Sequence, residues 1–345
     1  RGSAMIGSFG LQQYSVGGDF RREQVSGGAN LSLLSSEGYR DQSGMSRKAF
    51  NLDFKVPLSD KSSLAPVLLI TDLFYETPGG LNKAQFEADP SQARPPVSTP
   101  TSYFPGASEQ KASVHNRAIF FGVAHELEWN ERWNTASSIY GALIDFENPA
   151  IRNYEQREEP NFGGRSVTRV TSGKGLFKNI SSFGAEFQLL DASIVVAQNE
   201  RGKKGSLVSQ DNLLSKLFSV FAQHEILYNE NSNVTVGLSA NFAGVYFRRS
   251  LPEIVDARRD FKPVISPRIA ALRKISDGIS IYGTYSHGFS PPTIAELYPS
   301  RQVFDTGLEP ERGRNFETGV KGKALRQKLR YEFAVYHFNL AETIV

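Results

Sequence analysis

The stretch FNLDFKV, from Phe50 to Val56, alternates strictly between apolar and polar residues. Its apolar residues are separated by Asn51, Asp53 and Lys55. A period of two places successive side chains on opposite faces of an extended chain. The stretch therefore predicts a β-strand with one apolar face and one polar face.

The same alternation recurs from Val234 to Phe242 (VTVGLSANF) and from Leu329 to Val335 (LRYEFAV). A soluble β-sandwich would show this pattern too, but its strands average about five or six residues, whereas a strand that crosses an outer membrane needs about nine to eleven. The runs here favour the longer value. We predict an all-β chain, residues 1–345 forming part of one antiparallel transmembrane β-barrel with about fifteen strands.

Composition excludes several other classes of protein. Aromatic residues reach 11%, with 24 Phe and 13 Tyr, while hydrophobic residues as a whole stay at 39%. No apolar stretch approaches the roughly 18 residues of a transmembrane helix. The net charge of +3 gives no field that would recruit nucleic acid. The absence of cysteine excludes a disulfide framework, a thiolate metal site and a cysteine nucleophile.

Connections between the predicted strands alternate between short and long, as expected for tight periplasmic turns and extended outer loops. Short connections include Leu58–Ser62, Asn130–Trp133 and Asn229–Asn233. The predicted long loops are residues 76–116, 146–177, 200–215, 246–263 and 289–313.

Two local features add to this interpretation. Trp129 and Trp133 flank one tight turn and suit an interfacial aromatic girdle, although packing in a soluble protein would place them equally well. From Leu189 to Ala197 the pattern predicts two strands that follow one another almost without a turn, with a short deletion or a missing loop near Asp191.

Two segments close to the end of the chain are more specific: YSHGFSPPTIAELY, from Tyr285 to Tyr298, and LEPERGRNFETG, from Leu308 to Gly319. Together they closely resemble the paired barrel signature of TonB-dependent outer-membrane receptors. The matching residues are Phe289, Pro292, Leu308, Pro310 and Glu311. Ser36–Ser43 (SEGYRDQS) and Tyr75–Arg94 also resemble two outer loops of siderophore receptors in this family.

This resemblance implies the barrel portion of a receptor in the bacterial outer membrane, which would have about twenty-two strands and a plug domain in its lumen. The sequence starts near the first barrel strand and ends near the fifteenth, so we expect the plug and the last strands to belong to a longer protein. The implied function is uptake of a ferric siderophore or similar iron chelate, powered by the TonB complex through the plug. Lumen-facing Asp53, Lys55, Glu317 and Lys321 are expected to contact that plug.

Three alternatives remain open at this point. A receptor of the same build could take another ligand, such as a cobalamin or an oligosaccharide. A passive porin-like barrel would have no gated transport. A soluble β-sandwich enzyme is the third, but no nucleophile, base and orienting acid occur in a recognisable pattern, so no catalysis is expected.

No cofactor or protein-bound metal is expected either. The five histidines are scattered, and none is paired at the spacing of metal ligands. Haem receptors of the family carry a histidine between the two signature boxes, and residues 290–307 contain none. This departure from the family pattern argues against haem as the ligand.

Candidate ligand-binding residues lie in the predicted outer loops. Around Tyr246 the chain carries clustered arginines, which suit an anionic, partly planar chelate through paired hydrogen bonds and cation–π contact. Contact with lipopolysaccharide phosphates, or an ion-pair network between loops, would explain them as well. The full set is Tyr103, Arg152, Tyr154, Arg165, Tyr246, Arg248, Arg249, Arg258, Arg259 and Arg301.

The prolines of the signature boxes have a simpler role than ligand contact. Proline cannot donate a hydrogen bond to a β-ladder, so Pro291, Pro292 and Pro310 are predicted to end strands and to stiffen the base of a long loop. Direct contact with a ligand is the alternative.

Overall fold

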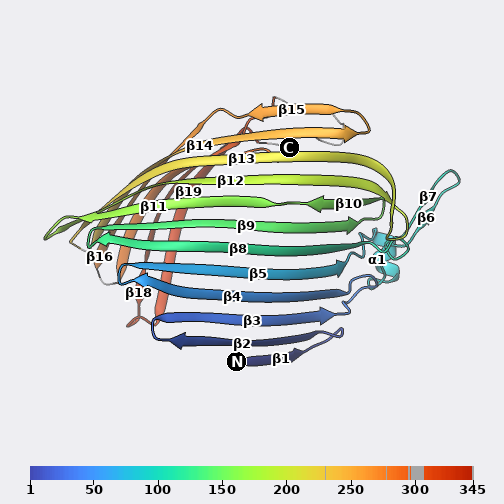
Figure 1. Ribbon diagram of the computed structural model, residues 1–345, viewed down its shortest axis with the longest axis horizontal. Coiled ribbons are helices and arrows are strands. Elements are labelled where there is room, and N and C mark those ends of the chain that lie inside the picture. Colours follow the sequence, from blue (N-terminus) through green and yellow to red (C-terminus); the bar gives the residue numbers. More distant parts are fainter. Residues whose placement is uncertain (230, 277, 294–295, 297–306, 344–345) are drawn as a thin grey trace.

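The computed structural model describes residues 1–229, 231–276, 278–293, 296 and 307–343. Seventeen strands form one antiparallel sheet, and a short hairpin and one helix lie in a loop beside it. The sheet curls along its width, so that β16 to β19 pass behind the front strands (Figure 1). The predicted antiparallel all-β barrel wall is confirmed.

The sheet strands in chain order are β1 (Gly2–Ile6), β2 (Gln12–Arg22), β3 (Val25–Ser36), β4 (Met45–Ser59), β5 (Ser62–Glu76), β8 (Ser113–Asn130), β9 (Trp133–Pro149), β10 (Asn153–Glu158), β11 (Asn161–Ser172), β12 (Phe177–Asn199), β13 (Lys204–Tyr228), β14 (Ser232–Leu251), β15 (Val255–Asp260), β16 (Val264–Ser276), β17 (Ile279–Ser290), β18 (Glu311–Ala324) and β19 (Leu329–Ala341). The loop elements are α1 (Lys83–Ala88), β6 (Val97–Ser98) and β7 (Tyr103–Phe104).

The sheet is a meander, because successive crossings of the chain lie next to one another and pair in antiparallel fashion. Two strands are interrupted: β10 and β11 both lie between β9 and β12, and β15 and β16 both pair with β14. Counting each interrupted pair as one crossing turns seventeen strands into fifteen. This agrees with the number predicted from the alternation.

The two faces of the sheet differ in character along its short-turn half. On β8, Ile119, Phe121 and Val123 are 43%, 48% and 36% exposed, and they share a face with Ile70 of β5 and Leu143 of β9. The opposite face of β8 carries Ala118, Gly122, Ala124 and Glu126, which are small or polar, together with Phe120, which stacks on Tyr140 of β9. An exposed apolar face of this width suits contact with hydrocarbon. We call it the lipid-facing side, and the opposite face the lumen-facing side.

The short-turn end lies at the left of Figure 1. Aromatic side chains pack against one another there. The Asn130 side chain accepts from the backbone N–H groups of Arg132 and Trp133 and so closes the turn between β8 and β9. The Trp133 ring meets the edge of Phe183 at 6.5 Å, and Phe177 packs against Tyr228 at 4.9 Å. These positions fit the interfacial girdle expected at the periplasmic end of a barrel.

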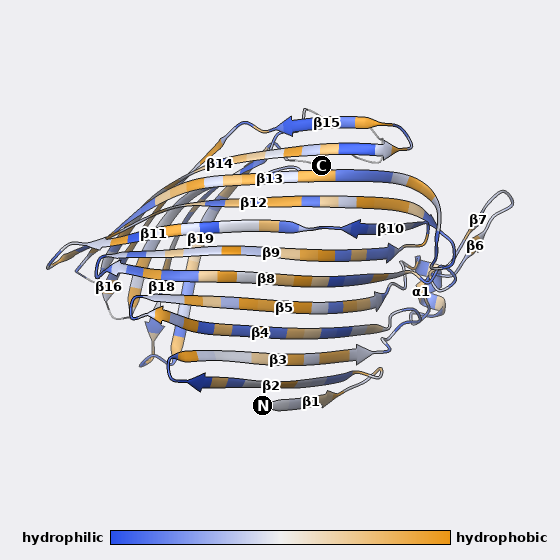
Figure 2. Cartoon of the chain, in the orientation of Figure 1, coloured by the Kyte–Doolittle hydropathy of each residue, from blue (hydrophilic) through white to orange (hydrophobic). Residues whose placement is uncertain are grey.

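At the opposite end, the sequence-based loop boundaries were partly wrong. Residues 153–172, predicted as loop, form β10 and β11, and the connections there shrink to residues 150–152 and 200–203. The predicted loop 246–263 is mostly the outer parts of β14 and β15. The first predicted long loop persists, as residues 77–112. Most of the last one lies outside the described residues. Figure 2 shows β10 and β15 as largely hydrophilic, which explains why alternation did not reveal them.

The predicted break near Asp191 was also wrong. β12 runs through it as one strand of 23 residues, with Asp191 opposite Leu214 of β13. The prediction failed because the apolar side chains of β12 move from the lipid-facing side to the lumen-facing side at this point. Leu189 lies on the lipid-facing side, whereas Ala192 and Ile194 face the lumen and pack into an internal cluster.

Helices contribute little to this architecture. α1 has six residues and is closed by a capping box in which Asn82 and Gln85 exchange side-chain and backbone hydrogen bonds. Among the described residues, no helix has the length and apolar character needed to cross a membrane.

The two faces predict different tolerance to charge. Replacing Val123 by Arg on the lipid-facing side should lower the free energy of unfolding by about 2–4 kcal/mol, because the charge would enter hydrocarbon. The matched variant Ala124→Arg, one residue further on and facing the lumen, should cost much less. Denaturant unfolding of the complete receptor in lipid vesicles measures both, and equal losses would contradict the assignment of faces.

Candidate functional site

The outer loops pack into one unit, which we call the outer cap and define as residues 37–44, 77–112, 150–152 and 200–203. The guanidinium of Arg40 donates through Nε and Nη2 to the carbonyl oxygen of Gln92, at 3.0 and 2.9 Å. The backbone N–H of Asp41 donates to the carbonyl of Ser91 at 2.8 Å. Gly38 holds a φ of +81°, which other residues rarely adopt. The two loops that resemble those of siderophore receptors are therefore bound to each other.

A second seam joins the later parts of the outer cap. The side-chain amide of Asn199, a residue 6% exposed, donates to the carbonyl oxygens of Gln110 and Ala150 at 2.9 and 2.6 Å. Ala93, Ala107 and Ala112 form a small buried cluster against Ile151. Residues far apart in the sequence thus fix one another at the loop end of the sheet.

Two of the predicted ligand residues lie on this cap. Tyr103 is 57% exposed on the short β6–β7 hairpin, and its hydroxyl donates to Glu109 at 2.5 Å. That hydrogen bond raises the pKa of the Tyr103 phenol above its ordinary value. Arg152 places its guanidinium 5.7 Å from the ring centre of Phe104 on the same hairpin. The hairpin therefore carries an exposed phenol at Tyr103 and a cation–aromatic contact at Phe104.

The four arginines near Tyr246 lie on strands and divide between the two faces of the sheet. Arg248 and Arg249 are consecutive in β14, and Arg258 and Arg259 are consecutive in β15. Since side chains alternate along a strand, one arginine of each pair faces the lumen and the other faces outward. Tyr246 stands opposite Arg258 in the register, on the lipid-facing side.

Arg249 is part of the lumen-facing core of the loop end. Its Nε and Nη2 atoms donate to the two carboxylate oxygens of Asp211 at 2.6 and 2.7 Å, and both side chains are only 9% exposed. Phe247, 1% exposed, lies two residues earlier on the same face. This bidentate pair is enclosed by the barrel wall, and its geometry is that of a structural contact.

Arg259 binds the second signature box. Its Nη2 donates to Glu309 at 2.9 Å and to the carbonyl oxygen of Leu308 at 3.2 Å. The Leu308 side chain packs against the cluster of Ala192, Leu213, Val245 and Phe261. The box thus lies on the lumen-facing wall of β12 to β15.

The prolines of the signature stand where strands end, as predicted. β17 ends at Ser290, immediately before Pro291 and Pro292, and Pro310 precedes the first residue of β18. Pro310 is less than 2% exposed, and Pro292 is also buried. Phe289 is half-buried one residue from the end of β17, and Glu311 opens β18.

A cavity of about 410 Å³ lies beneath the first box on the lumen-facing wall. Tyr140, Asn161 and Gln188 supply polar groups to its lining, and Pro291 and Pro292 close one side. Arg165 faces the lumen on β11, the strand that also carries Asn161. Its side chain is 52% exposed, 3.8 Å from Glu186 and 5.1 Å from the ring centre of Phe221. Sequence reasoning found Arg165 but missed the polar lining, because lumen-facing polar residues occur on every strand.

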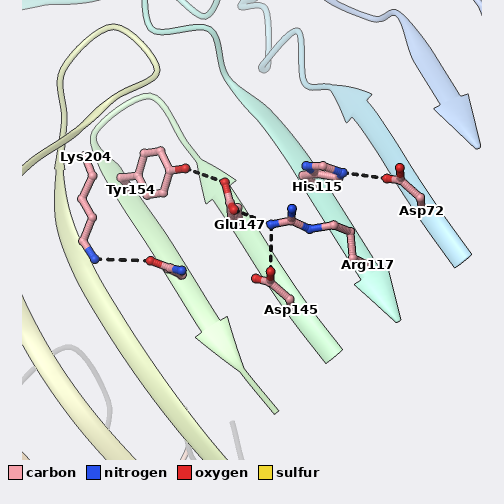
Figure 3. Close-up of polar contacts among 8 residues, drawn as sticks. Asp72, His115, Arg117, Asp145, Glu147, Tyr154 and Lys204 are labelled. Carbon is pink, nitrogen blue, oxygen red and sulfur yellow. Dashed lines mark hydrogen bonds and ion pairs between the residues drawn. The ribbon is translucent and has the colours of Figure 1, made fainter. Parts of the chain in front are cut away.

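Tyr154 belongs to a polar network on the outward face, shown in Figure 3. Its hydroxyl donates to Glu147 at 2.7 Å, and Arg117 reaches both Glu147 and Asp145, at 2.7 and 2.8 Å. Burial, followed by the hydrogen bond to Glu147, raises the pKa of Tyr154 to about 12. Arg117 shares its face with Ile119, so this network continues the lipid-facing side beyond the apolar belt.

Arg301 lies outside the described residues. Within the described part of the chain, no group of three or more histidines and carboxylates is arranged to hold a metal ion. Ligand contact by the remaining predicted residues stays a prediction.

Sequence comparison agrees with the curled sheet and its two faces. Residues 67–341 match the family described as TonB dependent receptor-like, beta-barrel. This chain belongs to that family. Its members are transport receptors of the bacterial outer membrane and not enzymes.

Solved structures share the fold at low sequence identity. The ferric citrate transporter FecA in its unliganded form is 13% identical, with a TM-score of 0.78. The match covers 98% of this chain and 50% of FecA. The ferric-catecholate import receptor Fiu from E. coli K12 is 12% identical, with a TM-score of 0.78. The match covers 98% of this chain and 57% of Fiu. The siderophore receptor PiuA from Acinetobacter baumannii is 11% identical, with a TM-score of 0.77. The match covers 97% of this chain and 56% of PiuA. The chain therefore spans little more than half the length of these receptors.

The buried pair of Asp211 and Arg249 predicts a strong stability effect. Arg249→Met alone should lower the free energy of unfolding by about 3–5 kcal/mol, because it leaves the Asp211 carboxylate buried without its partner. The double variant Asp211→Leu with Arg249→Met should recover most of the loss. Denaturant unfolding of the complete receptor tests this. A double variant no more stable than Arg249→Met would contradict the structural role.

Proposed function

We propose that the complete receptor imports a ferric siderophore or a similar iron chelate across the outer membrane with energy supplied by the TonB complex. The family assignment supports gated transport. The iron specificity rests on the similarity to FecA, Fiu and PiuA, whose names describe ferric citrate, ferric catecholate and siderophore transport.

The lumen-facing wall near the loop end offers suitable chemistry for an anionic chelate. Of the lumen-facing arginines Arg165, Arg249 and Arg259, Arg165 has the longest ion pair, because 3.8 Å separates it from Glu186. Arg249 and Arg259 are engaged at 2.6 and 2.9 Å. A partly exposed guanidinium over an aromatic ring can bind a planar carboxylate or catecholate through hydrogen bonds and cation–π contact. Arg165 and the cavity lined by Tyr140, Asn161 and Gln188 are the proposed contacts.

The proposed transport cycle needs no covalent chemistry. The outer cap and the upper lumen wall capture the chelate, and the TonB complex then displaces the plug to open the lumen. Two polar groups lower in the lumen suit contact with such a plug. Lys55 lies 3.9 Å from Glu126, and the Tyr282 hydroxyl donates to Glu317 at 2.9 Å.

Growth under iron limitation tests the proposal most directly. Deleting the gene should reduce growth on the correct ferric chelate as sole iron source, and the intact gene should restore it. Unchanged uptake of every ferric chelate tested, together with a loss of cobalamin or oligosaccharide uptake, would assign a different ligand. Uptake that continues without TonB would identify a passive pore.

The contact residue can be tested separately. Arg165→Gln should weaken binding of the transported chelate roughly tenfold, because one charged hydrogen bond and one cation–π contact are lost. Arg169→Gln is the matched control, since Arg169 lies on the same strand and face, closer to the periplasmic end. Titration of the purified receptor with the ferric chelate measures both. Equal affinities in the two variants would exclude Arg165 as a contact.

A further inference from the structure

Three segments of the outer cap bring exposed cationic side chains to one place. They are the end of the first long loop, the turn before β10 and the turn between β12 and β13, and they carry Lys111, Arg152, Arg201 and Lys203, which we call the cap cations. The amide of buried Asn199 binds the first two segments, and its side-chain oxygen accepts the backbone N–H of Gly202 at 2.7 Å. The Gln110 side chain accepts the backbone N–H of Arg201 at 2.9 Å. The cap cations therefore stand on one fixed support.

Two of the cap cations occupy a backbone conformation that usually selects other residues. Lys111 and Arg201 have φ values of +48° and +55°. Glycine and asparagine adopt this left-handed region most readily, whereas a long side chain there costs free energy. Arg201 is followed by Gly202 at a φ of +82°, and a hairpin turn with two positive φ values commonly has the sequence Asn-Gly. Local conformational preference therefore accounts for neither cation.

The same two residues lie close to each other and to the β6–β7 hairpin. A Cβ atom added to Gly202 would lie 2.9 Å from the Cβ of Lys111, so the turn between β12 and β13 packs directly on the Lys111 stem. The hydrogen bond to Glu109 raises the pKa of the Tyr103 phenol, and the charge of Arg201 acts on that phenol in the opposite direction. The positive charge is thus gathered at the base of the hairpin.

Acidic groups on these segments leave the cap cations without partners. Within the described part of the chain, no carboxylate lies within ion-pair distance of any of the four. Glu109 accepts the Tyr103 hydroxyl at 2.5 Å, and Glu200 packs against Gly205. The carboxylates nearest the adjoining ends of β9 and β10 pair with arginines of the sheet. Four cations and two acids give this part of the cap a net positive charge.

We propose that the cap cations form a capture site for polyanionic ferric chelates, which bind here first and then pass to the lumen-facing wall. This inference rests on the proposed function. Exposed charges of one sign raise the local concentration of an oppositely charged ligand and its rate of association. Guanidinium and ammonium groups also hold carboxylate and catecholate oxygens through charged hydrogen bonds. The capture site therefore favours polyanionic chelates over neutral ones by their speed of association.

The test measures association rates of the full-length receptor in detergent by stopped-flow spectroscopy. The probes are ferric citrate, the ferric tris-catecholate of 2,3-dihydroxybenzoate, and neutral ferric acetohydroxamate. The triple variant Lys111→Asn, Arg201→Asn and Lys203→Gln removes three charges. It should slow association of the two anionic chelates about tenfold at about 0.01 M salt, where the Debye length is about 30 Å. The difference should vanish at about 1 M salt, and the neutral chelate should associate equally fast with parent and variant.

Matched variants separate charge from structure. Lys61→Gln with Lys174→Gln and Lys328→Gln removes the same charge from exposed periplasmic turns and should associate like the parent receptor. The capture variant places asparagine at both left-handed positions, so its unfolding temperature should equal or exceed that of the parent. Slower association together with a lower unfolding temperature would assign the cations a structural role and overturn the proposal.

The remaining outcomes distinguish the capture site from the proposed function. Equal association rates of the anionic chelates with the capture variant and the periplasmic variant would overturn the capture site and leave iron uptake standing. Binding of the neutral chelate alone by the parent receptor would do the same. A parent receptor that binds none of the three chelates would count against iron-chelate uptake itself, and the capture site would fall with it.

Discussion

Backbone pairing between neighbouring strands is the constraint on which the rest of this structure depends. In hydrocarbon a strand can satisfy its N–H and C=O groups only through its neighbours, and an antiparallel register then fixes the face on which each side chain lies. Between β13 and β14 the register is unbroken from Asp211 opposite Arg249 to Tyr228 opposite Ser232. A slip of one residue would turn Phe242 into the lumen and Asn241 into the lipid. Asn241 instead bonds Ser219 and the carbonyl of Val264 on the lumen side.

The same constraint explains how much of the fold could be read from the sequence. Where a strand lies in the apolar belt, alternation marks it directly, as in FNLDFKV and in the run from Val234 to Phe242. Beyond the belt the apolar side chains move to the lumen face. Leu189 faces outward and Leu190 inward, and the next apolar residues, Ala192 and Ile194, stay inside. A reversal of phase in one continuous strand has the same sequence pattern as two strands that meet, so the false break near Asp191 was a natural error.

The candidate site was only partly accessible to sequence reasoning. The signature prolines were predicted correctly as strand ends because proline has no N–H to offer a ladder. The contacts that assemble the outer cap could not be predicted, because they join distant residues. Asn199 meets Gln110 and Ala150, which lie 89 and 49 positions away. Tyr154 was selected as a loop residue, but the strand β10 turns it toward Glu147 on the outward face.

The two Arg-Arg pairs show how alternation gives one sequence feature two functions. In β14 and β15 each pair sends one guanidinium into the lumen and the other outward, where the environments are opposite. Inside, burial makes an unpaired charge costly, and Arg249 and Arg259 accordingly meet Asp211 and Glu309. Outside, water and lipid headgroups solvate the charge, so no such partner is required of Arg248. A cluster that looks like one basic loop in the sequence therefore places buried, paired arginines on one face of the wall and exposed arginines on the other.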